Sequence, residues 1–183
     1  SIWVRTEYGL HRFHQDTFSL ITKSDGLLSN VITSLAVDSL GSIWVGTLQG
    51  GLAKIKKNVV QTVGHTMTRG SRAILSLSAD SKQLWIGTMK GLYSLGYNEK
   101  KIQYITDTDY TPITAIQVDE DERVWFGTMA DGLKMLVDGR IVDIPEFHTK
   151  HIRSLYIDDR NSIWIGTDRD GLLSQCASKN YAL

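Results

Sequence analysis

The sequence predicts an all-β fold, a β-propeller built of small four-stranded antiparallel sheets, from three observations. A tryptophan-containing segment recurs along the whole chain, which is the mark of a repeat architecture. The segments between its copies are short, rich in β-branched residues and alternating in polarity, as strands are. Glycines and Asp/Ser clusters separate these segments, and no stretch combines ten residues of helical periodicity with helix caps.

The repeated segment reads Trp-x-Gly-Thr in four of its five copies, and a Gly-Leu pair follows each copy. Successive tryptophans are 41, 41, 40 and 39 residues apart. A period of about 40 residues fits either a propeller blade or a helical repeat of the HEAT or armadillo type, and the strand-like pattern favours the blade. All five tryptophans of the chain lie in this segment: Trp3, Trp44, Trp85, Trp125 and Trp164.

The second unit shows the four strands that we expect in each blade, named A to D in chain order. They span about 31–38, 43–47, 52–56 and 59–63. Later A strands are expected at about 73–78, 113–119 and 152–158. Such blades pack face to face around a common axis.

The chain opens with strands B, C and D of one blade and closes with A, B and C of another. Because both ends carry their own B and C strands, the two partial blades cannot merge into one closing blade. We therefore expect an open arc of about five blades, and, since Ser1 falls in the middle of the pattern, a piece of a longer chain. The partial blades are 1–22 and 152–176, and the complete ones are about 31–63, 73–105 and 113–144.

The repeated residues have structural roles in this reading. Each indole fills the space between neighbouring blades, and its truncation to alanine costs ~3–5 kcal/mol when the ring is fully buried. The glycine after Trp-x marks a close approach of the next blade, and the glycine of Gly-Leu supplies a positive φ in the B–C turn. Arg5 replaces the first of these glycines in the first copy, so we expect it to point into open space at the end of the arc, or toward a partner or ligand.

The A–B turns are rich in aspartate. Asp side chains accept hydrogen bonds from their own turn backbone, so we expect stapled hairpins. Calcium loops are disfavoured, because no segment has the acidic ligand pattern closed by a bidentate glutamate. The four turns are 38–41, 80–82, 119–122 and 158–161.

Composition excludes several classes of protein. Apolar residues make up 42% and charged residues 22%, which excludes disorder. Twenty basic residues balance twenty acidic ones, which argues against nucleic-acid binding and against contact with an anionic membrane. No apolar run approaches the ~18 residues of a membrane span. Cys176 is the only cysteine, so an internal disulfide and a cysteine-based zinc site are excluded.

One unit carries a specific resemblance. Residues 26–30 read Gly-Leu-Leu-Ser-Asn, and Asp38, Gly41, the Trp-Val-Gly-Thr segment 44–47 and the Gly-Leu pair 51–52 follow. This pattern closely resembles the two-component regulator propeller repeat, although the Leu-Ser-Asn opening is clear only once. The resemblance implies a piece of a seven-bladed sensor propeller on the periplasmic or extracellular side of a bacterial inner-membrane protein. It also implies a kinase or diguanylate-cyclase output elsewhere in the parent chain, and an oligosaccharide as a ligand.

A ligand is expected on one face of the arc. Strand direction alternates within a blade, so the D–A and B–C loops share a face, and the repeats differ from one another there. Grafted specificity explains that variation, and so does the freedom of exposed loops; both readings stay open. Planar polar groups and aromatic rings suit a sugar or a small anion. The expected ligand-binding residues are Tyr8, Gln49, His65, Arg69, Arg72, Lys90, Asp109, Tyr110, Asp131, His148, His151 and Arg169.

No cofactor, metal site or catalytic set is expected. His11 and His14 are three residues apart in a strand, so they point to opposite faces. His148 and His151 lie in one loop, but no third ligand is indicated. The leading hypothesis is a non-catalytic sensory module that binds a small ligand or dimerises through its parent ectodomain. The alternatives are a protein-interaction scaffold and a propeller lyase that uses His148 and a divalent metal.

Overall fold

The computed structural model describes residues 1–63, 72–99, 101–108 and 110–176. Within these ranges the chain forms eighteen β-strands and two 3₁₀ helices of three residues each. The strands make five antiparallel sheets of three, four, four, four and three strands, each in chain order. The predicted all-β propeller architecture, as an open arc, is confirmed.

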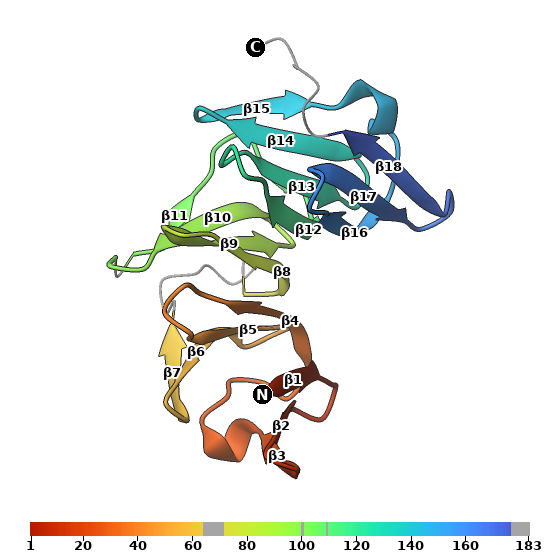
Figure 1. Ribbon diagram of the computed structural model, residues 1–183. Coiled ribbons are helices and arrows are strands. Elements are labelled where there is room, and N and C mark those ends of the chain that lie inside the picture. Colours follow the sequence, from red (N-terminus) through yellow and green to blue (C-terminus); the bar gives the residue numbers. More distant parts are fainter. Residues whose placement is uncertain (64–71, 100, 109, 177–183) are drawn as a thin grey trace.

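The sheets, here called blades 1 to 5, follow one another along the arc in Figure 1, with blade 1 at its lower end. Blade 1 contains β1 (Ile2–Arg5), β2 (Leu10–His14) and β3 (Thr17–Ile21), followed by η1 (Lys23–Asp25). Blade 2 contains β4 (Ile32–Val37), β5 (Ile43–Thr47), β6 (Gly51–Lys56) and β7 (Val59–Val63). Blade 3 contains β8 (Ile74–Ala79), β9 (Gln83–Thr88), β10 (Gly91–Gly96) and β11 (Gln103–Tyr104). Blade 4 contains β12 (Ile113–Val118), β13 (Val124–Thr128), β14 (Leu133–Val137) and β15 (Arg140–Asp143), followed by η2 (Pro145–Phe147). Blade 5 contains β16 (Ile152–Ile157), β17 (Ser162–Thr167) and β18 (Leu172–Cys176).

The A strands lie innermost and contact one another along the axis: β4 contacts β8, β8 contacts β12, and β12 contacts β16. Side-chain hydroxyls join neighbouring A strands. Ser76 Oγ donates to the carbonyl of Ile113 at 3.0 Å, and Thr114 Oγ1 donates to that of Ile152 at 2.5 Å. The blades are thus tied by polar bonds at the axis as well as by apolar packing.

One aspartate in each of blades 2 to 5 links the A–B turn to strand B. Its Oδ1 accepts turn backbone N–H groups, as predicted; in blade 4 these are the N–H groups of Asp121 and Arg123, at 3.0 and 2.9 Å from Asp119. Its Oδ2 accepts the indole N–H of the repeated tryptophan, a bond that the sequence did not reveal. The Nε1–Oδ2 distances are 3.0 Å for Trp44–Asp38, 2.7 Å for Trp85–Asp80, 2.7 Å for Trp125–Asp119 and 2.9 Å for Trp164–Asp158.

The tryptophans fill the space between blades, as predicted. Trp125 of blade 4 is 0% exposed and packs with Ile152 and Ile163 of blade 5. The glycine two residues later allows this approach, because a Cβ on Gly127 would lie 2.3 Å from Ile152 Cγ2. Trp164, in the last blade, is 38% exposed.

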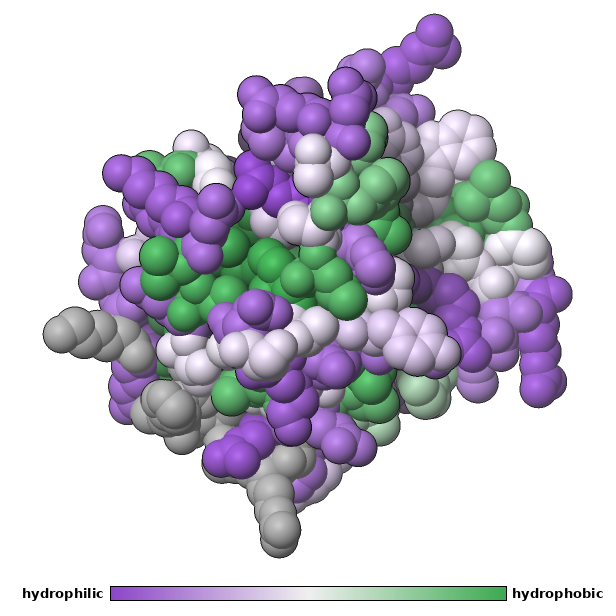
Figure 2. All heavy atoms as spheres, turned by 90° about the horizontal axis from the view of Figure 1, so that it is seen from below, coloured by the Kyte–Doolittle hydropathy of each residue, from purple (hydrophilic) through white to green (hydrophobic). Residues whose placement is uncertain are grey.

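Both ends of the arc present apolar side chains to solvent. Figure 2 looks onto the blade 1 end and shows an apolar area bordered by hydrophilic side chains. The large apolar residues exposed in blade 1 are Ile2, Val4, Phe18 and Leu20, and those in blade 5 are Tyr156, Trp164 and Leu172. These faces lack a neighbouring sheet among the described residues.

A comparison of Trp125, which lies between two blades, with Trp164, in the last blade, gives a direct test of this packing. In the 183-residue chain, Trp125→Ala removes a fully buried ring from between two blades, and we expect it to lower the free energy of unfolding by about 3–5 kcal/mol. Trp164→Ala removes the same indole–aspartate bond but a half-exposed ring, so its cost should be less than half as large. Urea unfolding measures both; equal losses would contradict the packing role.

The Asp–Trp link also predicts the response to acid. Burial raises the pKa of Asp38, but hydrogen bonds from Ser42, Trp44 and Lys54 outweigh it, and the net pKa lies below 3.8. A pKa depressed in the folded state gives stability that is complete above the unfolded value and is lost as pH falls through the folded value. The urea concentration at the unfolding midpoint of the wild type should therefore decrease as the pH drops below about 4.

The matched variant is Asp38→Asn, which should lose about 1–3 kcal/mol at pH 7 and show a flatter decline below pH 4. Asp16→Asn, which removes a carboxylate from the exposed β2–β3 hairpin, serves as control and should follow the wild type. A decline as steep in Asp38→Asn as in the wild type would assign the acid sensitivity to other groups.

Candidate functional site

The B–C turns share one construction in all five blades. In blade 3, Thr88 Oγ1 donates to the carbonyl of Gly91 at 3.0 Å and accepts the backbone N–H of Lys90 at 3.0 Å. Equivalent threonine–glycine bonds close the other turns, at Thr6–Gly9, Thr47–Gly51, Thr128–Gly132 and Thr167–Gly171. The five glycines have φ between +73° and +139°, so the predicted positive φ is confirmed.

At Gly9, Gly91 and Gly132 the end of strand D or the D–A loop lies directly on the B–C turn, whereas a Cβ on Gly51 or Gly171 would meet nothing within 4 Å. A Cβ on Gly132 would lie 1.9 Å from the carbonyl oxygen of Phe147, and one on Gly91 would lie 2.7 Å from that of Thr108. Thr108 is 2% exposed, and its Oγ1 accepts the backbone N–H of Leu92 at 3.0 Å. Gly91 and Gly132 thus let two D–A loops pack closely on the B–C turns, on the rim formed by the D–A and B–C loops.

The structure brings two of the expected ligand-binding residues together. Lys90 lies in the B–C turn of blade 3, and Tyr110 lies in the D–A loop that leads to blade 4. The Lys90 ammonium is 5.4 Å from the centre of the Tyr110 ring, within cation–π range. Tyr110 is 77% exposed, and its φ of +58° projects it from a left-handed turn. An aromatic face and a cation are therefore presented side by side to solvent.

The other expected residues are not joined in this way. Within the described part of the chain, no hydrogen bond or ion pair connects their side chains to another member of the predicted set. The exposed ones are Tyr8, Gln49, Arg72, Asp131, His148, His151 and Arg169. His65, Arg69 and Asp109 lie outside the described residues.

Ion pairs near blade 5 were missed by the sequence analysis. Lys150 Nζ lies 2.8 Å from Asp170 Oδ1, and Arg153 Nη2 lies 2.9 Å from Asp168 Oδ1. These pairs link the D–A loop and strand β16 to the B–C turn of blade 5, and spacing along the chain gave no signal of them. Among the described residues, no group of three or more His, Cys, Asp or Glu side chains is placed to hold a metal ion.

Arg5 makes a contact that its place in the sequence did not predict. Its side chain is exposed, its guanidinium donates to the carbonyl of Thr33 in β4, and it lines an axial cavity of about 240 Å³. In blade 2 the equivalent position is Gly46, where a Cβ would lie 2.3 Å from Ser34 Oγ of strand A. Blade 1 has no described A strand inside β1, so an arginine side chain fits there.

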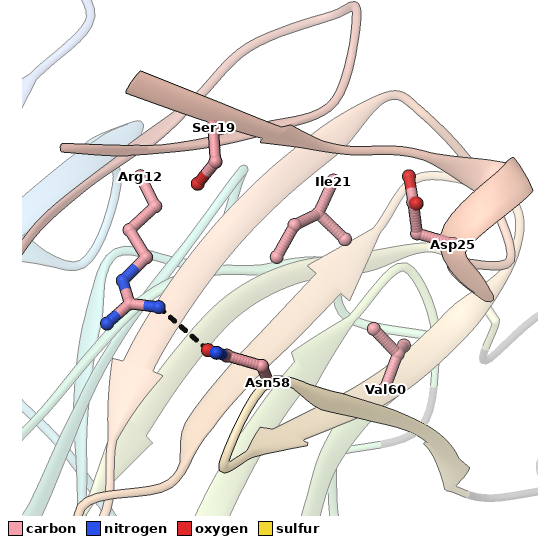
Figure 3. Close-up of a pocket in the computed structure, with 6 residues that line it drawn as sticks. All are labelled: Arg12, Ser19, Ile21, Asp25, Asn58 and Val60. Atoms are coloured by element: carbon pink, nitrogen blue, oxygen red, sulfur yellow. Dashed lines mark hydrogen bonds between the residues drawn. The ribbon is translucent and has the colours of Figure 1, made fainter. Parts of the chain in front are cut away.

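A larger cavity, of about 360 Å³, lies between the outer strands of blades 1 and 2 (Figure 3). It was also missed, because most of its walls come from strands C and D and the C–D hairpin of different blades; one lining residue, Asp25 in η1, belongs to the first D–A loop. Its lining residues are Arg12, Ser19, Ile21, Asp25, Asn58 and Val60.

Comparison with known families bears on this architecture. Residues 26–49 and 147–169 match the two-component regulator propeller family. These two segments are similar to the two-component regulator propeller repeat. The first match coincides with the unit that shows the full pattern, and the second covers the last D–A loop with blade 5 strands A and B. No curated protein matches the sequence significantly.

Solved structures share the fold at low sequence identity. The extracellular domain of the putative hybrid two component system BT4673 from B. thetaiotaomicron superimposes with a TM-score of 0.82 at 20% identity, over 94% of this chain and 25% of that one. Virginiamycin B lyase from Staphylococcus aureus gives 0.71 at 11% identity, over 97% and 67%. The computationally designed Ika4 protein gives 0.63 at 15% identity, over 80% and 91%.

The present chain thus spans about a quarter of the BT4673 domain. Within the described ranges, no helix has the length and apolar character needed to cross a bilayer.

The contact between the repeated glycines and the rim loops can be tested with two glycines of nearly equal φ. Gly132→Ala combines a φ of +74° with a collision against a backbone carbonyl, whereas Gly139→Ala, at +75°, meets nothing within 4 Å. We expect Gly139→Ala to cost about 1–2 kcal/mol and Gly132→Ala to cost about 3 kcal/mol or more. Thermal unfolding of the two variants measures the difference; equal costs would show that the loop is free to move.

Proposed function

We propose that this chain is part of a non-catalytic, ligand-sensing propeller of a bacterial signalling receptor, exposed on the periplasmic or extracellular side of the membrane. The two-component regulator propeller repeats support this function, as does the shared fold with the extracellular domain of BT4673. The observation that carries the proposal is the contrast on the rim: five turns closed by the same threonine–glycine bond lie beside loops of different chemistry.

The ligand that best fits the rim is a small polar molecule such as an oligosaccharide. The Tyr110 ring offers a flat apolar face on which a pyranose can stack, and Lys90 beside it donates to hydroxyl or carboxylate oxygens. Both side chains are exposed, so a ligand reaches them without a large rearrangement.

Signalling requires that the ligand bind two receptor arrangements with different affinity, because only differential affinity shifts an equilibrium. In the proposed receptor, binding changes the relative placement of two parent ectodomains, and a histidine kinase or similar output in the parent chain responds. A homodimer of the parent ectodomain is part of this proposal.

Virginiamycin B lyase shares the fold, so a lyase is the second candidate. Metal-dependent turnover that His148→Ala abolishes would favour it over a sensor. A pure protein-interaction scaffold would bind a protein partner and give no response to small molecules.

The sensor proposal is tested by calorimetry of the parent ectodomain with a panel of neutral and acidic oligosaccharides. We expect at least one member to bind, and Tyr110→Ala and Lys90→Ala each to weaken that binding about tenfold or more, equivalent to ~1.4 kcal/mol. Arg160→Ala, in an A–B turn on the opposite face, is the control and should bind as the wild type does. Absence of heat across the panel would count against the proposal, and unchanged affinity in Tyr110→Ala would move the site elsewhere.

A further inference from the structure

The space between blades 1 and 2 changes from apolar to polar toward its outer end. Near the axis it is filled by a core cluster that includes Leu10, Ile32 and Val45. Farther out, between strands C and D of the two blades, it opens into the cavity of about 360 Å³ shown in Figure 3. Arg12 and Asn58 face each other across it.

The residue types at two paired positions distinguish this interface from the one between blades 4 and 5. Arg12 of β2 pairs with Trp3 of β1 and with Ser19 of β3. The equivalent residues of blade 4 are Met135 and Val142, which belong to or pack against the core cluster with blade 5. Apolar side chains fill the space between blades 4 and 5 at these positions, whereas Arg12 and Ser19 line a cavity between blades 1 and 2.

Arg12 carries a charge that no carboxylate neutralises in the described part of the chain. Lys54 and Arg123 also lie over the tryptophans of their blades, but each pairs with a buried aspartate, Asp38 or Asp119. Arg12 stacks at 5.3 Å on its tryptophan and donates only to neutral oxygens. These are Asn58 Oδ1 at 2.7 Å and Ser1 Oγ at 3.3 Å. A guanidinium held in this way is the group that best recognises a carboxylate.

The remaining lining groups extend the site away from Arg12. Asn58 uses its oxygen on Arg12, so its amide N–H₂ is available to donate, and Ser19 adds a hydroxyl. Ile21 and Val60 form apolar walls. Asp25 lies at the far end, where the backbone N–H and hydroxyl of Thr22 both donate to its Oδ2, at 2.9 and 3.1 Å.

These two bonds from Thr22 hold the pKa of Asp25 below its ordinary value, so the carboxylate is charged at neutral pH. It can accept hydroxyl or ammonium donors through Oδ1. One cavity therefore has a cation, Arg12, at one end, apolar walls in the middle and an anion, Asp25, at the other end. Its volume suits a molecule of monosaccharide size.

We propose that this cavity is a binding site for a small carboxylate that carries hydroxyl groups, the chemistry of an acidic monosaccharide. The ligand carboxylate lies on Arg12 with Asn58 and Ser19 beside it, and a ligand hydroxyl donates to Asp25. This site meets the rim at Asp25, in η1 of the first D–A loop, but it does not include Lys90 or Tyr110 and does not rest on their being functional.

The experiment compares glucuronate with glucose by calorimetry on the folded chain, because the two sugars differ in the carboxylate. We expect glucuronate to bind at least tenfold more tightly than glucose. Arg12→Gln should weaken glucuronate binding at least tenfold and remove the preference for the acid. The control Arg140→Gln deletes the same charge from an exposed hairpin of blade 4 and should bind as the wild type does.

A second variant keeps Arg12 in place. Asn58→Asp retains a residue type that tolerates the φ of +63° at this position and puts a carboxylate next to the guanidinium. This internal carboxylate competes with the ligand, so glucuronate affinity should again fall at least tenfold. If Arg12→Gln fails to fold, as judged by circular dichroism, Asn58→Asp decides.

The proposal is overturned if wild-type protein gives no glucuronate binding at millimolar concentration, if glucose binds equally well, or if Asn58→Asp binds glucuronate unchanged. Tyr110→Ala separates the two sites. It should leave glucuronate binding intact, and a loss of binding in this variant would place the sugar acid on the rim instead.

Discussion

One carboxylate in each complete blade holds together three parts of the structure. The aspartate of the A–B turn uses one oxygen to close its own hairpin and the other to fix the indole of strand B. The indole then fills the space to the next blade. Because the same side chain sets the turn, the ring orientation and the blade contact, a small repeat with a modest core obtains a unique packing. The bond is strongest where it is buried, as at Asp119 and Trp125.

The repeats share one framework and differ in sequence mainly at positions that the framework does not require. The threonine–glycine turns fix the backbone of the rim, and the loops above them differ in charge and aromatic content. The outer ends of the blade interfaces also differ, from Arg12 and Ser19 in blade 1 to Met135 and Val142 in blade 4. The rim loops and the outer ends of the blade interfaces are therefore two places where the chemistry of the repeats differs.

The rim and the outer interface differ in how far residue order predicts them. Lys90 and Tyr110 could be predicted as neighbours on one face, because strand alternation alone assigns loops to faces. Their 5.4 Å separation could not, because it depends on the course of the D–A loop over the turn. The cavity between Arg12 and Asn58 could not be predicted at all, since those residues are 46 positions apart and meet only when two sheets pack.

Arg5 also shows that a local sequence feature does not predict a long-range contact. The sequence identified it as the one departure from the glycine position, which is a local fact. Its contact with Thr33 could not be predicted, because that depends on whether an A strand lies inside β1 and on where the carbonyl of Thr33 points.

The sequence by itself determined the repeat, the strand order, the interblade tryptophans and the glycine turns, because each follows from local spacing and from the φ values that residue types allow. Only the tertiary structure decided the indole–aspartate bonds, the pairing of Lys90 with Tyr110 and the polar cavity of Arg12. The indole–aspartate bonds join residues five or six positions apart, but they depend on how the hairpin orients the ring toward the turn. The other two features depend on the distance between separate segments, which packing sets and no single segment of the chain encodes.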